Sequence, residues 1–114
     1  MGSAKTALLL TTAYNFEERD MNYVCLKPVI DTREKEAVIR SRIGIERKCL
    51  WIYHDTDLYL MAQEMFERTM TVIDWFLIDE AQFLTAEQVD QLARVVDDYG
   101  SNVICYGLRT AFKT

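Results

Sequence analysis

The chain is poor in histidine, proline, glycine and cysteine, and it has no long apolar run. Its 114 residues include one histidine, one proline, four glycines and three cysteines. Cys25, Cys49 and Cys105 are widely spaced and form no CxxC pair, so they suit a reducing compartment and exclude a cysteine zinc site within these residues. His54 alone cannot build a metal site, which needs several ligands. Without a secretory leader or an apolar span of about 18 residues, we expect a soluble, cytoplasmic protein with no membrane partner.

Charge and length limit the protein further. The formal net charge of -5 argues against a nucleic-acid partner, because phosphate backbones favour basic surfaces. Half of the residues, 50%, are hydrophobic, which is ordinary for a globular protein. A chain of this length buries a single core, so we expect one domain over residues 1–114.

Apolar patterns predict strands and helices in alternation. Strands are expected at 22–29, 49–54, 72–80 and 102–107, and helices at 5–20, over 58–66 and from Thr85 to Gly100. In the last helix, Val89, Leu92, Ala93 and Val96 are expected to face the core. Residues 30–48 are highly charged and are predicted to be a long excursion. This alternation is typical of an α/β fold with a mostly parallel sheet.

The first chemistry-bearing stretch is "MGSAKTALLL" at residues 1–10. Lys5 and Thr6 supply the K-[ST] end of a Walker A phosphate loop, in which the lysine reaches the β- and γ-phosphates, the hydroxyl binds Mg²⁺ and backbone N–H groups hold the phosphates. Ala4 stands where the pattern has glycine, and a left-handed backbone there would cost roughly 1–2 kcal/mol. The alternative is a solvated lysine at a helix N-terminus, where the helix dipole disfavours it. A strand is expected just before Met1, since phosphate loops follow strands.

The second stretch is "FLIDEAQF" at residues 76–83. An apolar strand that ends at Asp79 is what a Walker B element needs, since the carboxylate joins the Mg²⁺ shell directly or through water. Glu80 would point to the other side of the strand and reach a nucleophile. The alternative is a strand end that simply meets solvent. "DEAQ" also fits the second motif of helicase-type ATPases, but this short, acidic chain lacks their basic surfaces.

The chain resembles the type II thymidine kinases. "MGSAKTALLLTTAYNFEERDM", "KPVIDTR", "SRIGI", "DEAQFL" and "CYGLRTAF" follow in the order and at about the spacings of that family, with the bacterial and phage branch most similar. The resemblance implies a P-loop NTPase-like three-layer α/β fold. It also implies ATP- and Mg²⁺-dependent phosphorylation of the 5′-hydroxyl of thymidine, with deoxyuridine a possible substrate. Homotetramers, feedback inhibition by dTTP and a role in nucleotide salvage are further implications.

The resemblance assigns roles to individual residues. Glu80 matches the general base, and Thr6 and Asp79 match the Mg²⁺ residues. The phosphate-binding residues it implies are Met1, Gly2, Ser3, Ala4, Lys5, Thr6 and Arg33. The residues it implies for the thymidine pocket are Met1, Phe83, Leu108 and Phe112. Without the resemblance, Arg33 reads as a solvated loop arginine and the apolar residues as ordinary core.

Two features of the family are expected to lie outside these residues. One is the first strand, and the other is a C-terminal domain with a cysteine-ligated structural zinc and a lasso loop over thymidine. Ala111 also departs from the family, whose members often carry an acid there. Two other functions remain open: a degenerate P-loop module that binds nucleotide without catalysis, and a DExx-type ATPase domain.

Overall fold

The computed structural model describes residues 3–29, 37–42 and 44–107. Its centre is a four-stranded sheet in the order β4-β1-β5-β6, in which every neighbouring pair is parallel. The strands are β1 (Tyr23–Pro28), β4 (Leu50–Ile52), β5 (Trp75–Ile78) and β6 (Asn102–Cys105). The predicted parallel sheet is therefore confirmed, with strands shorter than the apolar runs that predicted them.

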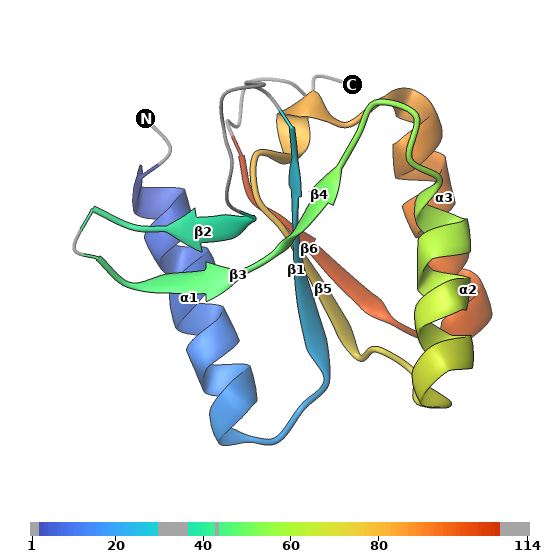
Figure 1. Ribbon diagram of the computed structural model, residues 1–114, viewed down its shortest axis with the longest axis horizontal. Helices are drawn as coiled ribbons and strands as arrows, with labels where there is room; N and C mark the ends of the chain where they lie inside the picture. Colours follow the sequence, from blue (N-terminus) through green and yellow to red (C-terminus); the bar gives the residue numbers. More distant parts are fainter. Residues whose placement is uncertain (1–2, 30–36, 43, 108–114) are drawn as a thin grey trace.

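Helices cover both faces of this sheet. Helix α1 (Ser3–Glu18) lies on one face, and α2 (Leu58–Thr69) and α3 (Ala86–Tyr99) lie together on the other (Figure 1). The three-layer α/β architecture matches the prediction. Because all four strands are parallel, their carboxyl ends meet at one edge of the sheet, where α1 also begins (Figure 1).

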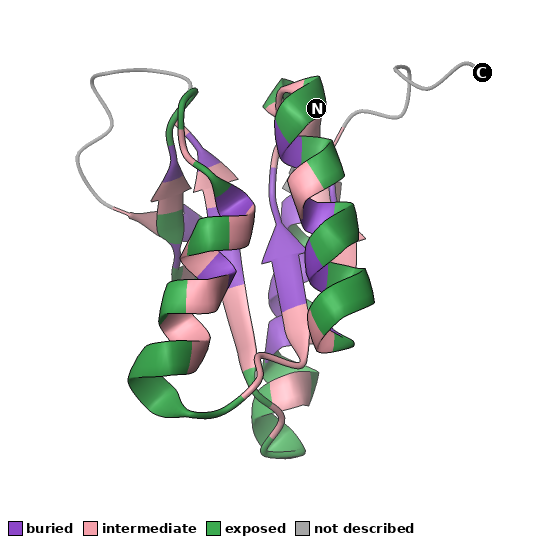
Figure 2. Cartoon of the chain, turned by 90° about the vertical axis from the view of Figure 1, so that its right-hand side faces the viewer, coloured by how far each residue is buried: buried purple, intermediate pink, exposed green. Residues whose placement is uncertain are grey.

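The two faces of the sheet form two separate cores. Cys25 and Leu77 pack with Leu9 and Ala13 of α1, whereas Leu26, Phe76 and Ile78 pack with α2 and α3. Neighbouring residues of β1 and β5 thus serve opposite cores, as the two-residue period of a strand requires. Figure 2 shows that burial concentrates on these strands between the helical layers.

A two-stranded antiparallel hairpin lies within the predicted long excursion of residues 30–48. Strand β2 (Val38–Arg40) pairs with β3 (Glu46–Lys48), two short strands that the sequence did not predict. The hairpin forms because Ile39 is fully buried in the core beneath α1, while Arg47 pairs with Glu17 of that helix at 2.9 Å. Residues 30–36 lie outside the described residues.

The buried face of α3 also differs from the prediction. Its N-cap at Thr85 and its left-handed C-cap at Gly100 are as expected. However, the buried residues are Gln88, Leu92 and Val95, whereas three of the four residues expected in the core are exposed: Val89, Ala93 and Val96. Gln88 is drawn inward because its amide donates to the carbonyls of Tyr53 and Thr56, and these bonds set the rotation of the helix.

The cysteines behave in two ways. Cys25 and Cys49 are buried as small core residues, whereas Cys105 is exposed on β6. None of the helices within the described ranges is long and apolar enough to span a bilayer.

Candidate active site at the carboxyl edge of the sheet

The two predicted Walker elements meet in space. Thr6 lies in the first turns of α1, and Asp79 follows the last residue of β5. The Thr6 hydroxyl donates a hydrogen bond to Asp79 Oδ2 across 3.3 Å, joining residues 73 positions apart. Both side chains are buried, at 9% and 4% exposure. The fold therefore brings a helix N-terminus, a hydroxyl and a carboxylate to one point.

The Asp79 carboxylate is in an unfavourable place for a charge. Burial raises the pKa of Asp79 above its ordinary value, and the neighbouring Glu80 charge raises it further. The Glu80 N–H, which donates to Asp79 Oδ1 at 3.1 Å, opposes this rise in pKa. Lys27 and Thr6 oppose it more weakly. An ionised Asp79 is thus a site where a cation would be stabilised.

These residues fit a magnesium ion. A divalent cation between Thr6 and Asp79 would offset the charge whose burial raises the pKa of Asp79. No cluster of three or more His, Cys, Asp or Glu side chains suited to a metal occurs within the ranges that the structure describes. Such a cluster is not required, because Mg²⁺ in phosphoryl-transfer enzymes usually binds one or two protein ligands, substrate phosphates and waters.

The direction in which the chain turns at Glu80 cannot be inferred from its position after the strand. Strand β5 ends at Ile78, so simple strand alternation does not set the direction of Glu80. Its backbone is left-handed, with φ 53° and ψ 44°, and it caps the short 3-10 helix η1 (Ala81–Phe83). Adjacent acids thus have different surroundings: Asp79 is buried, whereas Glu80 is half-buried.

The phosphate-loop residues are described in part. Ser3, Ala4 and Lys5 form the beginning of α1, and Lys5 is half-buried. Because Ala4 is helical, its backbone carries no left-handed cost, and the objection to alanine at this position does not apply. Met1 and Gly2 lie outside the described residues.

Of the predicted nucleoside pocket, only Phe83 is described. Its side chain lies on η1 and is 53% exposed, which is unusual for a ring of ordinary core. Leu108, Phe112 and Ala111 lie outside the described residues, as does the phosphate candidate Arg33.

Three residues near the acids were not singled out from the sequence. The charge of Lys27, near the end of β1, lowers the pKa of Asp79. Gln82 bonds Glu80, and Gly107 lies against Gln82. In the sequence, only the motif "DEAQF" indicates Gln82. The proximity of Lys27 and Gly107 to the two acids depends on the order of the strands in the sheet.

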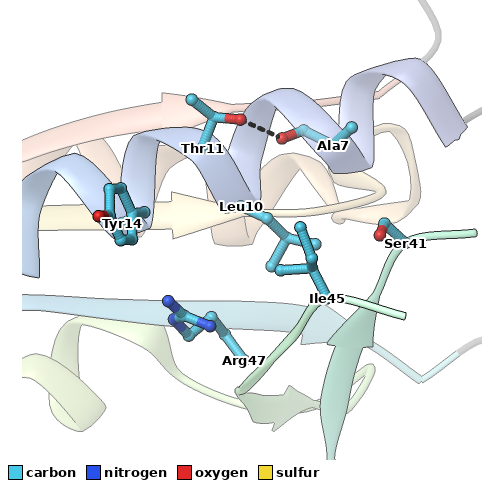
Figure 3. A pocket seen from close by; sticks show the side chains of 7 residues that line it. All are labelled: Ala7, Leu10, Thr11, Tyr14, Ser41, Ile45 and Arg47. Atoms are coloured by element: carbon cyan, nitrogen blue, oxygen red, sulfur yellow. Dashed lines mark hydrogen bonds between the residues drawn. The ribbon is translucent and has the colours of Figure 1, made fainter. Parts of the chain in front are cut away.

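A separate cavity of about 340 Å³ lies between α1 and the hairpin (Figure 3). Its lining residues are Ala7, Leu10, Thr11, Tyr14, Ser41, Ile45 and Arg47. Among the lining residues that the structure describes there is no acid, and Arg47, the one cation among them, is paired with Glu17. This cavity is therefore distinct from the acidic edge and unsuited to a phosphate.

The fold and the paired Walker elements define the class first. A parallel three-layer α/β domain with a K-[ST] helix start bonded to the acid after a strand is typical of P-loop nucleoside-triphosphate-binding proteins. A family model described as thymidine kinase matches residues 1–114. The chain belongs to the thymidine kinase family.

Individual relatives agree with this assignment. The chain is 43% identical to a thymidine kinase of Enterobacteria phage T4 over 98% of its own residues and 57% of the phage protein. It is 42% identical to one from Zymomonas mobilis over 99% of its residues and 58% of that protein. A Coxiella burnetii thymidine kinase is 39% identical, with 57% of it covered. The chain therefore spans a little over half the length of these relatives.

Proposed function

We propose that the full-length protein is a thymidine kinase that transfers the γ-phosphate of ATP to the 5′-hydroxyl of thymidine. The observation that carries the proposal is the hydrogen bond between Thr6 and Asp79, which joins the two predicted Walker elements. Membership of the thymidine kinase family supports the choice of acceptor.

Asp79 and Glu80 have distinct roles in the proposed reaction. Thr6 and Asp79 would hold Mg²⁺, which when bound neutralises charge on the phosphate oxygens. Glu80 takes the proton of the 5′-hydroxyl while the 5′ oxygen forms its bond to the γ-phosphorus. The bond from that phosphorus to the bridging oxygen breaks, and ADP leaves with the electron pair. Placing the base beside the acceptor lowers the barrier because no separate encounter is needed.

The remaining ligand contacts are proposals on the same basis. Lys5 and the N–H groups at the start of α1 would bind the β- and γ-phosphates, with Met1, Gly2, Ser3, Ala4 and Arg33 completing that site. The exposed ring of Phe83 suits stacking on a pyrimidine, with Met1, Leu108 and Phe112 around it. A homotetramer, inhibition by dTTP, deoxyuridine as a second substrate, a structural zinc elsewhere in the protein and cytoplasmic salvage follow from the family resemblance.

A Glu80→Gln variant tests the base. We expect formation of dTMP by the full-length protein to fall by about 10²- to 10⁴-fold, with ATP binding retained, because glutamine cannot accept the proton. The measurement is ATP-dependent phosphorylation of thymidine, beside ATP affinity by calorimetry. Glu87→Gln, at an exposed acid of α3, is the matched control and should leave the rate unchanged.

Three results would overturn either the role of Glu80 or the kinase function. An unchanged rate of dTMP formation in Glu80→Gln would show that Glu80 is not the base. ATP binding without any dTMP would favour a degenerate nucleotide-binding module. ATP hydrolysis that depends on single-stranded nucleic acid would favour a DExx-type ATPase.

A further inference from the structure

The side chain of Glu80 is held by its neighbours in an unusual turn. Glutamate at φ 53° and ψ 44° is strained by roughly 1–2 kcal/mol, and such a conformation persists only where the surroundings enforce it. Two backbone bonds enforce it: the Glu80 N–H donates to Asp79 Oδ1 at 3.1 Å, and the Ala81 N–H donates to the carbonyl of Tyr106 at 2.8 Å. The turn is thereby attached to the end of β6.

These backbone bonds leave the carboxylate itself to be oriented, and Gln82 contacts it directly. Gln82 Nε2 donates to Glu80 Oε1 across 2.8 Å, and both side chains are half-buried. A carboxylate has two acceptor oxygens, so a bond to Oε1 restricts the rotation of the group and leaves Oε2 available for another partner. Glutamine can do this without adding charge, whereas a basic side chain would compete for the phosphates.

Gly107 leaves the space that this contact requires. A Cβ placed on Gly107 would lie 2.1 Å from Gln82 Oε1 and 3.2 Å from the Ala81 nitrogen. Its φ is outside the left-handed region, so the position needs glycine for room rather than for backbone freedom. Any larger residue would push the Gln82 amide away from where it meets Glu80.

We propose that Gln82 is a positioning residue that orients the Glu80 carboxylate toward the acceptor hydroxyl, and that Gly107 keeps the Gln82 amide in place. The inference rests on the proposed function, since it acts through Glu80 as the base. It adds a requirement that the Asp79–Glu80 pair does not contain: the end of β6 must pass close to η1 for the base to be aligned.

A double-mutant cycle on the full-length protein tests the contact. Gln82→Met keeps the length of the side chain but removes the donor. We expect it to lower kcat by about 10- to 100-fold, the scale of a misplaced reacting group, with KM for ATP changed by less than about twofold. In the Glu80→Gln background, the same substitution should change kcat by less than about twofold, because there is no base left to orient. Gln63→Met on α2 is the matched control and should have no effect in either background.

The role of Gly107 has its own cycle. Gly107→Ala should lower kcat in the presence of Gln82. The double variant Gln82→Ala/Gly107→Ala should be no slower than Gln82→Ala alone, because the overlap with Gln82 Oε1 is then absent and only the 3.2 Å contact with the Ala81 nitrogen remains. Far-ultraviolet circular dichroism of each variant reports whether it is folded.

The outcomes separate the two proposals. Suppose that Glu80→Gln is slow. The positioning role is then overturned, while the kinase stands, if Gln82→Met is as active as the wild type or raises only KM. The same conclusion follows if Gln82→Met slows the Glu80→Gln variant further. If Gly107→Ala is equally harmful with and without Gln82, the spacing argument is overturned. If no dTMP forms, the proposed function fails and the inference fails with it. If dTMP forms but Glu80→Gln is harmless, the kinase stands, whereas the base role of Glu80 and the inference both fail.

Discussion

At the scale of single residues, the buried Asp79 carboxylate is destabilising when it is ionised, and under the proposed function it is a ligand for a cation. Asp79 is 4% exposed, and burial raises its pKa above the ordinary value of 3.8. A carboxyl whose pKa is higher in the folded than in the unfolded protein favours folding when protonated and disfavours it when ionised. Its contribution to stability is present below the unfolded pKa and is lost as the pH rises through the folded value. At neutral pH the protein therefore carries a net penalty at this residue.

Asp79→Asn should remove that penalty. We expect the free energy of unfolding at pH 7 to be higher than that of the wild type, because asparagine can accept from the Glu80 N–H with its oxygen and donate to the Thr6 hydroxyl oxygen with its amide nitrogen, without a buried charge. The difference should shrink as the pH is lowered through the raised pKa and toward 3.8, where the wild-type carboxyl becomes protonated. The measurement is urea unfolding across this pH range.

The matched control is Asp97→Asn, at an exposed acid of α3. It should not reproduce the gain in stability at pH 7. A lower stability of Asp79→Asn at pH 7 would contradict the account. Under the proposed function, Mg²⁺ with ATP should raise the melting temperature of the wild type much more than that of Asp79→Asn.

At the scale of elements, α3 shows how a cap and a buried amide decide the rotation of a helix. Thr85 and Gln88 form a capping box in which the Thr85 hydroxyl accepts from the Gln88 N–H, and the Gln88 amide oxygen accepts from the Thr85 N–H. The amide nitrogen of Gln88 also bonds the carbonyls of the loop after β4. A polar residue therefore lies on the inner face, displacing Val89 to 48% exposure.

Thr85→Ala should destabilise the protein by about 1 kcal/mol, because the first turn of α3 loses its side-chain acceptor. Thr85→Ser keeps the hydroxyl and should stay within about 0.5 kcal/mol of the wild type. Chemical denaturation of the full-length protein measures both. Equal stability of the alanine and serine variants would show that the capping bond contributes nothing.

At the scale of the whole molecule, two cores share one sheet, and the site depends on how α1 is seated. Leu77 is fully buried beneath α1. The hydroxyl of Tyr106 at the end of β6 donates to Thr12 of α1 at 3.1 Å. These contacts fix the start of α1 over the end of β5, so that Thr6 meets Asp79.

Leu77→Ala should therefore affect both stability and nucleotide binding. We expect a loss of about 2–5 kcal/mol, as for other large-to-small changes in a packed core. Val89→Ala, at an exposed position of α3, should cost about 0.5 kcal/mol or less. Thermal unfolding measures the first effect, and ATP affinity of the folded fraction measures the second. A Leu77→Ala protein as stable as Val89→Ala would contradict the burial on which this packing is based.

The local sequence was sufficient to predict an α/β fold with a mostly parallel sheet and the two stretches that meet at the site, whereas the three-layer form was implied by the resemblance to type II thymidine kinases. Helix stripes, apolar strands, the N-cap at Thr85 and the C-cap at Gly100 all depend on neighbours along the chain, so a single sequence reveals them. The same holds for Lys5-Thr6 and Asp79-Glu80, whose residue types the proposed phosphate and metal chemistry requires.

Tertiary contacts decided the rest. The hairpin at 38–48 exists because Ile39 and Arg47 find partners on α1, and the buried face of α3 follows the bonds of Gln88 to a distant loop. The turn at Glu80, its contact with Gln82 and the room left by Gly107 require β6 to lie beside β5. These features join residues that are far apart in the chain, so the contacts between them stabilise the protein only once the sheet has formed. Local patterns predict where such groups occur but not which of them meet.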